Sequence, residues 1–288
     1  MRLALLGFGL IGGSIARAIR AHPTAEISSV VAWSPSGRGP RAALADKVID
    51  AAAGSPAQAV EGAELVVLAA DPLACLDLLD QLARLANRDD PITISDVAST
   101  KTALGRRADA LGLAFVGGHP MAGLEATGYE NSRAELFAGR PWVLCPGTNA
   151  GPDDLARVER LVRACGAEGL RLAAEDHDRA VAAISHLPLA VAAALVDSVR
   201  DGADWELAQR LAAGGWLSAT RLALGDPRMG AGIAATNRAD LAVRLRALRS
   251  QLDEWLEDLE ETPDDPAATA ARIARRLEAA RQALVQGG

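Results

Sequence analysis

The histidine at position 119 stands in the stretch GGHPMAG (117–123), whose glycines and proline suit neither a helix nor the interior of a strand. The chain has only four histidines. Gly117 and Gly118 are expected to let the backbone turn sharply, and Pro120 to stiffen the exit. An imidazole held on such a turn can take a proton or a hydrogen bond from an alcohol that loses hydride. His119 is therefore a candidate catalytic residue, and the alternative is a histidine that only supports the turn.

The stretch SDVASTK (95–101) is a second candidate for the site, because it also follows an expected strand. Ligands of a dinucleotide-binding fold bind beyond the carboxyl ends of its parallel strands. Ser99 is therefore a candidate site residue, or else the N-cap of a helix that begins near Thr100. Lys101, in the same stretch, is interpreted as a surface lysine.

A glycine-rich turn, GFGLIGGS, lies between the first expected strand and the first expected helix. Gly7, Gly9 and Gly12 form the pattern GxGxxG. The first glycine permits the tight turn, the second lets the backbone approach a pyrophosphate, and the third lets helix and strand pack closely. The helix N-terminus then faces the phosphates. Leu10, Ile11, Asp71 and Ser99 are also expected to contact the cofactor.

The end of the second expected strand, VVAWSPSGRGPR, bears on which dinucleotide binds. An NAD site usually has a carboxylate here for the ribose 2′-hydroxyl. This chain has Ser34 instead, followed by Arg38 and Arg41. A hydroxyl and a guanidinium accommodate a 2′-phosphate, so NADP is favoured over NAD. The alternative is that both arginines are simply solvated.

The first half of the chain alternates strand-like runs with helical patterns, which is typical of a parallel α/β sheet covered on both faces. The strand-like runs are residues 2–7, 27–33, 63–70, 91–97, 113–118 and 141–146, and the helical ones are 10–21, 73–87 and 100–111.

The second half has no strand-like run from about Ala174 onward, and helical periodicity takes over. The helical segments are residues 175–200, 203–213, 238–261 and 266–285. The segment 238–261 carries alternating charges, as in RLRALRSQLDEWLEDLEE, with Leu or Trp at three- and four-residue spacing, which is typical of an amphipathic helix. We expect a Rossmann-type domain at 1–172 and an all-helical domain at 173–288.

Composition narrows the class of protein. The chain has 288 residues, a formal net charge of −7 and 50% hydrophobic residues. The acidic balance argues against a nucleic-acid or anionic-membrane partner. Three scattered cysteines suggest a reducing compartment and neither a disulfide framework nor a metal site. The apolar stretch 180–196 is short and interrupted by polar residues and Pro188, so a buried helix is expected rather than a membrane span. A cytoplasmic location is expected.

Five stretches in this order resemble the prephenate/arogenate dehydrogenase family of tyrosine biosynthesis: GFGLIGGS, SDVASTK, GGHPMAGLEATGYENSRAELFAGRPWVLCP, DHDRAVAAISHLP and GGWLSATRLALGDPRM. The resemblance covers about residues 1–240. It implies a Rossmann domain followed by a helical domain that forms a homodimer. It also implies oxidation and decarboxylation of a cyclohexadiene carboxylate, prephenate or arogenate, with hydride transfer to NAD(P).

The resemblance assigns roles to individual residues. His119 matches the family histidine that hydrogen-bonds the C4 hydroxyl of the ring and draws off its proton as hydride leaves. Ser99 matches a serine that helps to hold the same hydroxyl. Arg221 matches an arginine that binds a substrate carboxylate. Ser185 and His186 match the SHLP start of a helix that enters the cleft, where Pro188 can kink it.

The chain also departs from the family pattern. Many relatives read SHLPH, with a second histidine that contacts the substrate side chain, whereas Leu189 stands here. Many have an Asp near Ser218 and a Trp where this chain has Gly230. No regulatory tail is expected after Gly288. These differences leave the choice of substrate open.

Three other functions are alternatives for a chain with these motifs. A related β-hydroxyacid dehydrogenase usually relies on a lysine in its second domain, whereas this chain has only Lys47 and Lys101. A 4-amino-4-deoxyprephenate dehydrogenase of secondary metabolism would need a pocket for an amine. A redox sensor without turnover would leave His119 and Arg221 without a purpose.

Overall fold

The computed structural model describes residues 1–22, 26–85, 92–124, 126–261 and 264–286. The chain divides into two compact units, Met1–Arg238 and Ala239–Gly288. The first unit holds the sheet and all the elements that carry the candidate site.

Eight strands form one sheet among the described residues, in the order β3-β2-β1-β4-β5-β6-β7-β8. They are β1 (Arg2–Leu6), β2 (Ser29–Trp33), β3 (Ala51–Ala52), β4 (Leu65–Leu68), β5 (Thr93–Asp96), β6 (Phe115–Pro120), β7 (Pro141–Pro146) and β8 (Glu168–Arg171). Every neighbouring pair is parallel except β6 and β7. The described residues of the connection between those two strands contain a short 3-10 helix and no α-helix, whereas a parallel return usually includes a crossover helix. The sheet is therefore mixed but mainly parallel, as the α/β pattern predicts.

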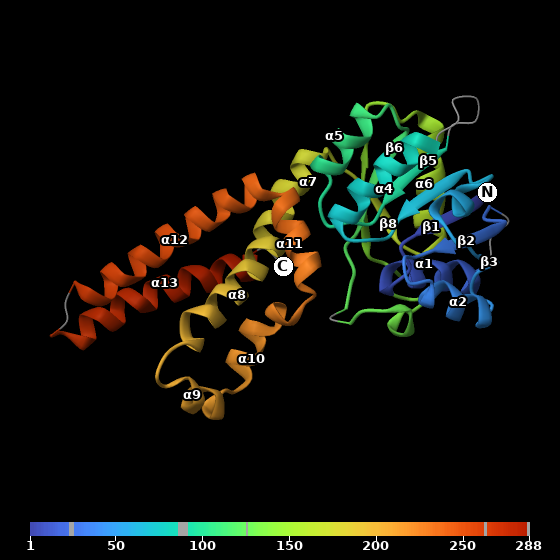
Figure 1. The fold of residues 1–288 in the computed structure, drawn as a ribbon. Coiled ribbons are helices and arrows are strands. Elements are labelled where there is room, and N and C mark those ends of the chain that lie inside the picture. The colour runs from blue at the N-terminus through green and yellow to red at the C-terminus, as the bar shows by residue number, and fades with distance from the viewer. Residues whose placement is uncertain (23–25, 86–91, 125, 262–263, 287–288) are drawn as a thin grey trace. The chain divides into compact units, whose positions relative to one another are not determined.

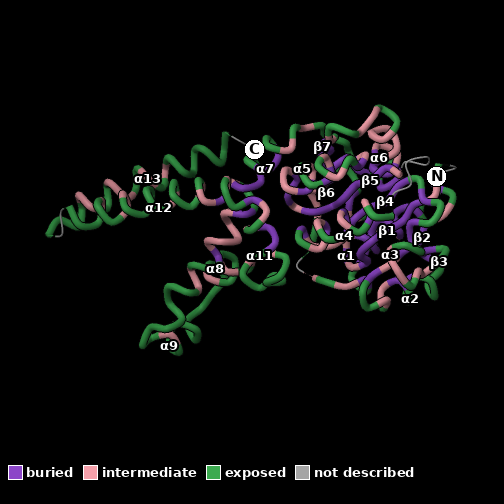
Figure 2. Tube along the Cα trace, turned by 45° about the horizontal axis from the view of Figure 1, so that its top comes forward, coloured by how far each residue is buried: buried purple, intermediate pink, exposed green. Residues whose placement is uncertain are grey.

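Helices cover both faces of this sheet (Figure 1). They are α1 (Leu10–Ala21), α2 (Arg38–Ala45), α3 (Pro56–Val60), α4 (Pro72–Leu85), α5 (Thr102–Ala110) and α6 (Pro152–Ala164). One apolar cluster joins α1, α2 and α6 to the sheet, and a second joins α3, α4 and α5 to it. Figure 2 shows the buried trace concentrated in these layers. Two expected segments, 73–87 and 91–97, have ends (86, 87 and 91) that lie outside the described residues.

The two glycines before His119 do not make a turn, so that expectation is wrong. Gly117, Gly118 and His119 all lie within β6, paired with β7. A Cβ on Gly118 would stand 2.5 Å from the carbonyl oxygen of Asp96, and one on Gly117 would stand 3.1 Å from the Lys101 side chain. The glycines are required because neighbouring chain segments approach the strand closely.

A long helical stretch follows the sheet. It comprises α7 (Ala174–Val181), one turn of π-helix named η2 (Ala182–His186) and α8 (Leu187–Arg200). Pro188 lies in the first turn of α8 and has no N–H to donate to the preceding turn. The π-turn ends two residues before this proline. Turns of π-helix are frequent at functional sites. Shorter elements complete this part of the unit: α9 (Trp205–Leu211), α10 (Gly214–Thr220), η3 (Arg221–Leu224) and α11 (Pro227–Thr236).

The expectation of a buried helix at 180–196 is not met within a single chain. The only buried residue of α8 is Ala192, and Figure 2 shows α8 mostly half-buried or exposed. Among the described residues, Ala174–Arg200 is the one helical stretch long and apolar enough to cross a membrane, by length and composition alone. Neighbouring apolar side chains are exposed too, with Leu224 at 86%.

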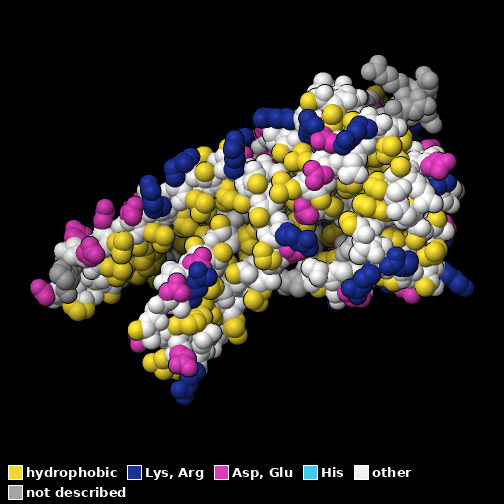
Figure 3. Space-filling model, in the orientation of Figure 1, with side chains coloured by type: hydrophobic (Ala, Val, Ile, Leu, Met, Phe, Trp, Pro, Cys, Tyr) yellow, Lys and Arg dark blue, Asp and Glu magenta, His cyan; other side chains and the backbone are white. Residues whose placement is uncertain are grey.

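The second unit contains most of α12 (Arg238–Glu260) and α13 (Pro266–Gln286). Arg276 on α13 bonds to Glu254 at 3.0 Å and also pairs with Asp258, both on α12. Apolar side chains gather along this hairpin (Figure 3). The larger exposed ones include Leu252, Leu256, Leu259, Leu277 and Leu284.

Candidate active site

The carboxyl ends of the parallel strands bring together the residues singled out in the sequence. Gly7 follows β1, Ser34 follows β2, and Asp71 comes three residues after β4. Ser99 follows β5, and His119 is the next-to-last residue of β6. This is the edge at which open α/β sheets bind their ligands.

The glycine turn has the geometry of a phosphate cradle. Gly7 has a φ of +92°, and a Cβ there would overlap the carbonyl of Ala69. A Cβ on Gly12 would stand 2.8 Å from the Gly7 oxygen, so helix and turn pack without room for a side chain. Gly9, in contrast, has open space before it and is the N-cap of α1 with no side-chain cap. The first amides of α1 are thus available to a pyrophosphate.

The end of β2 carries an unusual serine. Ser34 is buried, and its hydroxyl has no hydrogen-bond partner among the described residues. The Arg41 guanidinium lies over the β2–α2 loop and donates to the Ser36 carbonyl at 3.1 Å. Arg38 is exposed at the first position of α2. The loop that would meet the adenosine ribose thus carries a buried, unpartnered hydroxyl and the Arg41 guanidinium, and exposed Arg38 begins the helix that follows it.

The remaining expected cofactor residues have separate local roles. Asp71 accepts a hydrogen bond from the Ala74 amide at 3.0 Å, so its carboxylate caps the start of α4. Leu10 is buried, and Ile11 is half-buried against the core cluster of α1.

His119 belongs to a chain of hydrogen bonds. Its Nδ1 lies 2.8 Å from Nε2 of His177, and Nδ1 of His177 lies 2.8 Å from Oδ1 of Asp178. The same carboxylate accepts the backbone amides of Lys101 and Thr102, each at 2.8 Å. His177 and Asp178 are buried, whereas His119 is partly exposed. No partner for Nε2 of His119 is recorded among the described residues.

In the SDVASTK segment, neither Lys101 nor Ser99 has the role that was its alternative to a place in the site. Lys101 is not a surface lysine, because it and Asp96 are 0% exposed and form an ion pair. Its ammonium also donates to the Gly118 carbonyl at 2.6 Å. Ser99 is not the N-cap, because α5 begins at Thr102 and the Asp178 carboxylate caps its first amides. Ser99 instead lies half-buried in the loop.

Further hydrogen bonds join the helical elements to one another and to the loop after β5. Asn237 donates to the Asp178 carbonyl at 2.8 Å and lies 3.1 Å from Nδ1 of His186. The Thr100 and Thr236 hydroxyls lie 2.8 Å apart. His186 is buried next to the Ser99 backbone, and its Nε2 meets no described partner in hydrogen-bond geometry. His186 therefore has one buried donor still to be satisfied.

The surroundings set the protonation states. Burial lowers the pKa of His119 well below 6.5, and the nearby Lys101 charge lowers it further. Burial raises the pKa of Asp178, but hydrogen bonds from His177 and the two backbone amides outweigh it, so the net pKa is lowered. Burial also lowers the pKa of His186. Near neutral pH the site thus holds a neutral His119 and an ionised Asp178.

The residues expected to bind the substrate lie on three separate helical elements, η2, α8 and η3. Ser185 is exposed in η2, and Arg221 is exposed at the start of η3. Leu189 is half-buried, and its Cδ2 lies 3.5 Å from the place where a Gly230 Cβ would stand. The two positions that depart from the family pattern therefore lie side by side.

Sequence reasoning missed the residues that support His119. The sequence pattern assigned no role in the site to His177, Asp96, Asp178 or Asn237. The stretch DHD at 176–178 was the available signal. Its partners are 58 or more residues away along the chain, so spacing could not reveal them.

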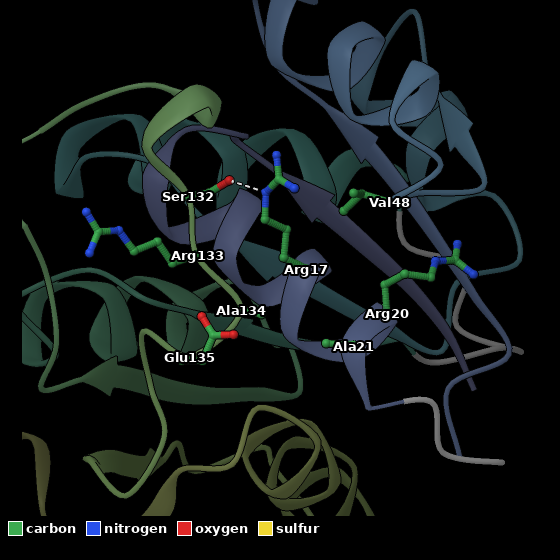
Figure 4. A pocket seen from close by; sticks show the side chains of 8 residues that line it. All are labelled: Arg17, Arg20, Ala21, Val48, Ser132, Arg133, Ala134 and Glu135. Carbon is green, nitrogen blue, oxygen red and sulfur yellow. Dashed lines mark hydrogen bonds between the residues drawn. The ribbon is translucent and has the colours of Figure 1, made fainter.

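The two hollows described on the surface lie away from this chemistry. The larger, of about 490 Å³, is lined by residues of α1 and of the segment after the 3-10 turn Tyr129–Asn131. In Figure 4 Arg17 bonds to Ser132 there, at 2.8 Å. Arg17 and Arg20 also pair with Asp46 and Asp50. Among the described residues, no group of three or more His, Cys, Asp or Glu is arranged to hold a metal.

A glycine cradle at a helix N-terminus, with a neutral histidine at the same sheet edge, defines an NAD(P)-dependent oxidoreductase. The family profile described as "Prephenate dehydrogenase, nucleotide-binding domain" matches residues 15–170. The profile described as "Prephenate dehydrogenase, dimerization domain" matches residues 173–268. The chain belongs to the prephenate/arogenate dehydrogenase family.

Individual relatives agree with this assignment. The chain is 33% identical over 263 residues to a prephenate dehydrogenase of Bacillus subtilis, covering 90% of this chain and 68% of the relative. It resembles the crystal structure of an arogenate dehydrogenase from Synechocystis with a TM-score of 0.76 and 29% identity, covering 99% and 100% of the two chains. A prephenate dehydrogenase from A. aeolicus, in complex with hydroxyphenyl propionate and NAD+, has a TM-score of 0.86 and 25% identity, covering 99% and 98%.

Proposed function

We propose that this enzyme oxidises and decarboxylates prephenate or arogenate, with hydride transfer to a nicotinamide cofactor, as a step of tyrosine biosynthesis. The observation that carries the proposal is His119. It is partly exposed at the sheet edge that holds the glycine cradle, and its pKa is lowered so that the imidazole is neutral. Such a group is suited to take the proton of a hydroxyl while hydride leaves the same carbon.

The proposed reaction balances with His119 as a catalyst. The C4 hydroxyl proton moves to Nε2 of His119 as the C4–H bond gives up hydride. The electrons of the bond to the ring carboxylate then enter the ring, CO₂ leaves, and the phenolate oxygen takes its proton back from His119. The nicotinamide, when bound, supplies the hydride acceptor. Because the product ring is aromatic, the enzyme mainly has to orient the substrate and polarise one hydroxyl.

Other residues follow their family counterparts in this proposal. Ser99 helps to hold the hydroxyl, and Arg221 binds a substrate carboxylate through charge-assisted hydrogen bonds. His186 and Ser185 line the entrance. The unsatisfied Nε2–H of His186 supports a polar role at this place. Leu189 cannot donate to the substrate side chain, which leaves either a keto-acid or an amino-acid end acceptable.

The cofactor is proposed to be NADP in preference to NAD. The open space before Gly9 fits a pyrophosphate. The unpartnered buried hydroxyl of Ser34 fits a ribose or its phosphate, with Arg38 and Arg41 nearby. No carboxylate follows β2 to repel a 2′-phosphate.

The enzyme is proposed to act as a homodimer in the cytoplasm, with cofactor bound by 1–172 and dimer contacts made by 173–288. The exposed apolar surface of α8 supports a partner subunit. The three cysteines are free thiols, which suits a reducing compartment.

A two-by-two assay tests the proposed function. Prephenate or arogenate is mixed with NAD or NADP, and the absorbance of the reduced nicotinamide is followed together with release of CO₂. At least one combination should give equal amounts of both products. No turnover in any combination, from folded protein that binds cofactor, would refute the function.

A further inference from the structure

The hydrogen-bond chain behind His119 has a direction. Burial raises the pKa of Asp178, but the hydrogen bonds that it accepts outweigh this effect and lower the pKa overall. Both carboxylate oxygens accept backbone amides, those of Lys101 and Thr102, so the carboxylate is ionised. An ionised carboxylate can only accept hydrogen bonds. At 2.8 Å from Asp178 Oδ1, Nδ1 of His177 must therefore carry the proton and donate it.

The donor of the next hydrogen bond, between the His177 and His119 rings, follows from the first. When His177 carries one proton, that proton is on Nδ1 and its Nε2 has a lone pair. That nitrogen lies 2.8 Å from Nδ1 of His119, so Nδ1 of His119 must be the donor. A neutral His119 then keeps its own lone pair on Nε2. This is the nitrogen that meets no partner among the residues the structure describes.

We infer that His177 and Asp178 are positioning residues that fix His119 in the one tautomer able to accept the substrate proton. The inference rests on the proposed function, in which Nε2 of His119 is the base. Without an acceptor at Nδ1, a neutral histidine can place its proton on either nitrogen, and the tautomer protonated on Nε2 cannot accept the substrate proton there.

The arrangement also ties the base to the rest of the site. Asp178 lies on α7, yet it caps α5 through the amides of Lys101 and Thr102. The same carboxylate thus fixes the imidazole chain and the end of the loop that carries Ser99. Asn237 holds the Asp178 carbonyl from the other side. Positioning of the base therefore depends on docking of the helical segment onto the sheet.

The direct test is the tautomer itself, measured on the wild-type enzyme with ¹⁵N-labelled histidine. Four histidines give few signals, and spectra of the His119→Asn and His177→Gln variants assign two of them. At a pH above the titration of His119, Nδ1 should show the shift of a protonated nitrogen and Nε2 that of an unprotonated one. A protonated Nε2 in the neutral ring would overturn the inference.

Kinetics of two variants supply a second test. His177→Phe removes the acceptor, and kcat should fall by about 10²-fold or more, the scale of general-base assistance. His177→Gln offers an amide oxygen to Nδ1 and should recover much of that loss. Values of KM should change little, since binding contacts stay. Asp176→Asn is the matched control, because Asp176 is an exposed neighbour paired only with Arg179 in the recorded ion pairs.

A purely structural role for His177 predicts a different pattern. Both variants would then lose thermal stability to a similar extent, and kcat per folded enzyme would stay near wild type in each. That result would overturn the inference. The ¹⁵N spectrum needs no substrate, so a failed proposed function would abolish turnover in the two-by-two assay and leave the tautomer result intact.

Discussion

At the scale of single residues, the site is a set of buried polar groups that fix one another. His119 has a low pKa through burial and the Lys101 charge, and its Nδ1 is held by His177. These contacts leave Nε2 of His119 as the ring nitrogen without a recorded partner among the described residues. The choice of cofactor and of substrate is proposed to depend on other residues, those after β2 and at the start of α8.

Cofactor choice is predicted to depend on the two arginines after β2. Replacing Arg38 and Arg41 together by alanine should raise the KM for NADP far more than the KM for NAD, because a 2′-phosphate loses its charged donors. Steady-state kinetics with both cofactors measure this. A wild-type kcat/KM that favours NAD by about tenfold, or 1.4 kcal/mol, would contradict the preference.

Substrate choice is predicted to depend on Leu189. Leu189→His introduces a donor that can be cationic, so the ratio of kcat/KM for prephenate to that for arogenate should rise. One hydrogen bond to a charged group is worth about 1.5–3 kcal/mol. The contact of Leu189 with Gly230 supports the alternative that leucine only packs there. A ratio within about twofold of wild type, with lower stability, would decide for packing.

At the scale of elements, the structure around β6 depends on the close approach of neighbouring chain segments to its two glycines. Gly118 lies between the Asp96 carbonyl and the Trp142 indole, and this lets Lys101 reach the Gly118 carbonyl. The strand that carries His119 is therefore locked to the loop that follows β5.

Gly118→Ala tests this packing. The added methyl would stand 2.5 Å from the Asp96 oxygen, so the free energy of unfolding should fall by about 1–3 kcal/mol. Gly123→Ala is the matched control, because nothing lies within 4 Å of its Cβ position. Its effect should stay within about 0.5 kcal/mol. Denaturant unfolding measures both, and equal effects would contradict the account of β6.

The sequence predicted the elements whose patterns are local. The runs at 27–33 and 63–70 contain β2 and β4, and the GxGxxG turn opens α1. It did not predict β3, which has two alanines, or β8, whose four residues are all exposed. Neither has a hydrophobic alternation to detect. The turn expected at Gly117 was wrong because glycine serves equally for turns and for tight packing. His177 was missed because only the fold brings it to His119.

At the scale of the whole molecule, a single chain leaves too much apolar surface uncovered. Ile184, Leu217 and Leu224 are all more than half exposed, and the apolar stretch Ala174–Arg200 is mostly unburied. Contiguous apolar surface of this kind generally marks an interface.

Light scattering should therefore report a particle of twice the 29.8 kDa chain mass at micromolar concentration. The dimer should persist in high salt, because burial of apolar surface drives it and charge screening does not weaken that term. A stable monomer under these conditions would contradict the proposed homodimer.

The central claim is that neutral His119 is the base, and the dependence of kcat/KM on pH tests it most directly when wild type is compared with His119→Asn. The base works only when unprotonated. Because the pKa of His119 lies below 6.5, wild-type activity should hold as pH falls to that value and decline only below it. His119→Asn should bind cofactor normally and lose about 10²–10⁴-fold in kcat, and this decline should disappear with it. A variant that keeps near-normal kcat and the wild-type pH profile would contradict the account.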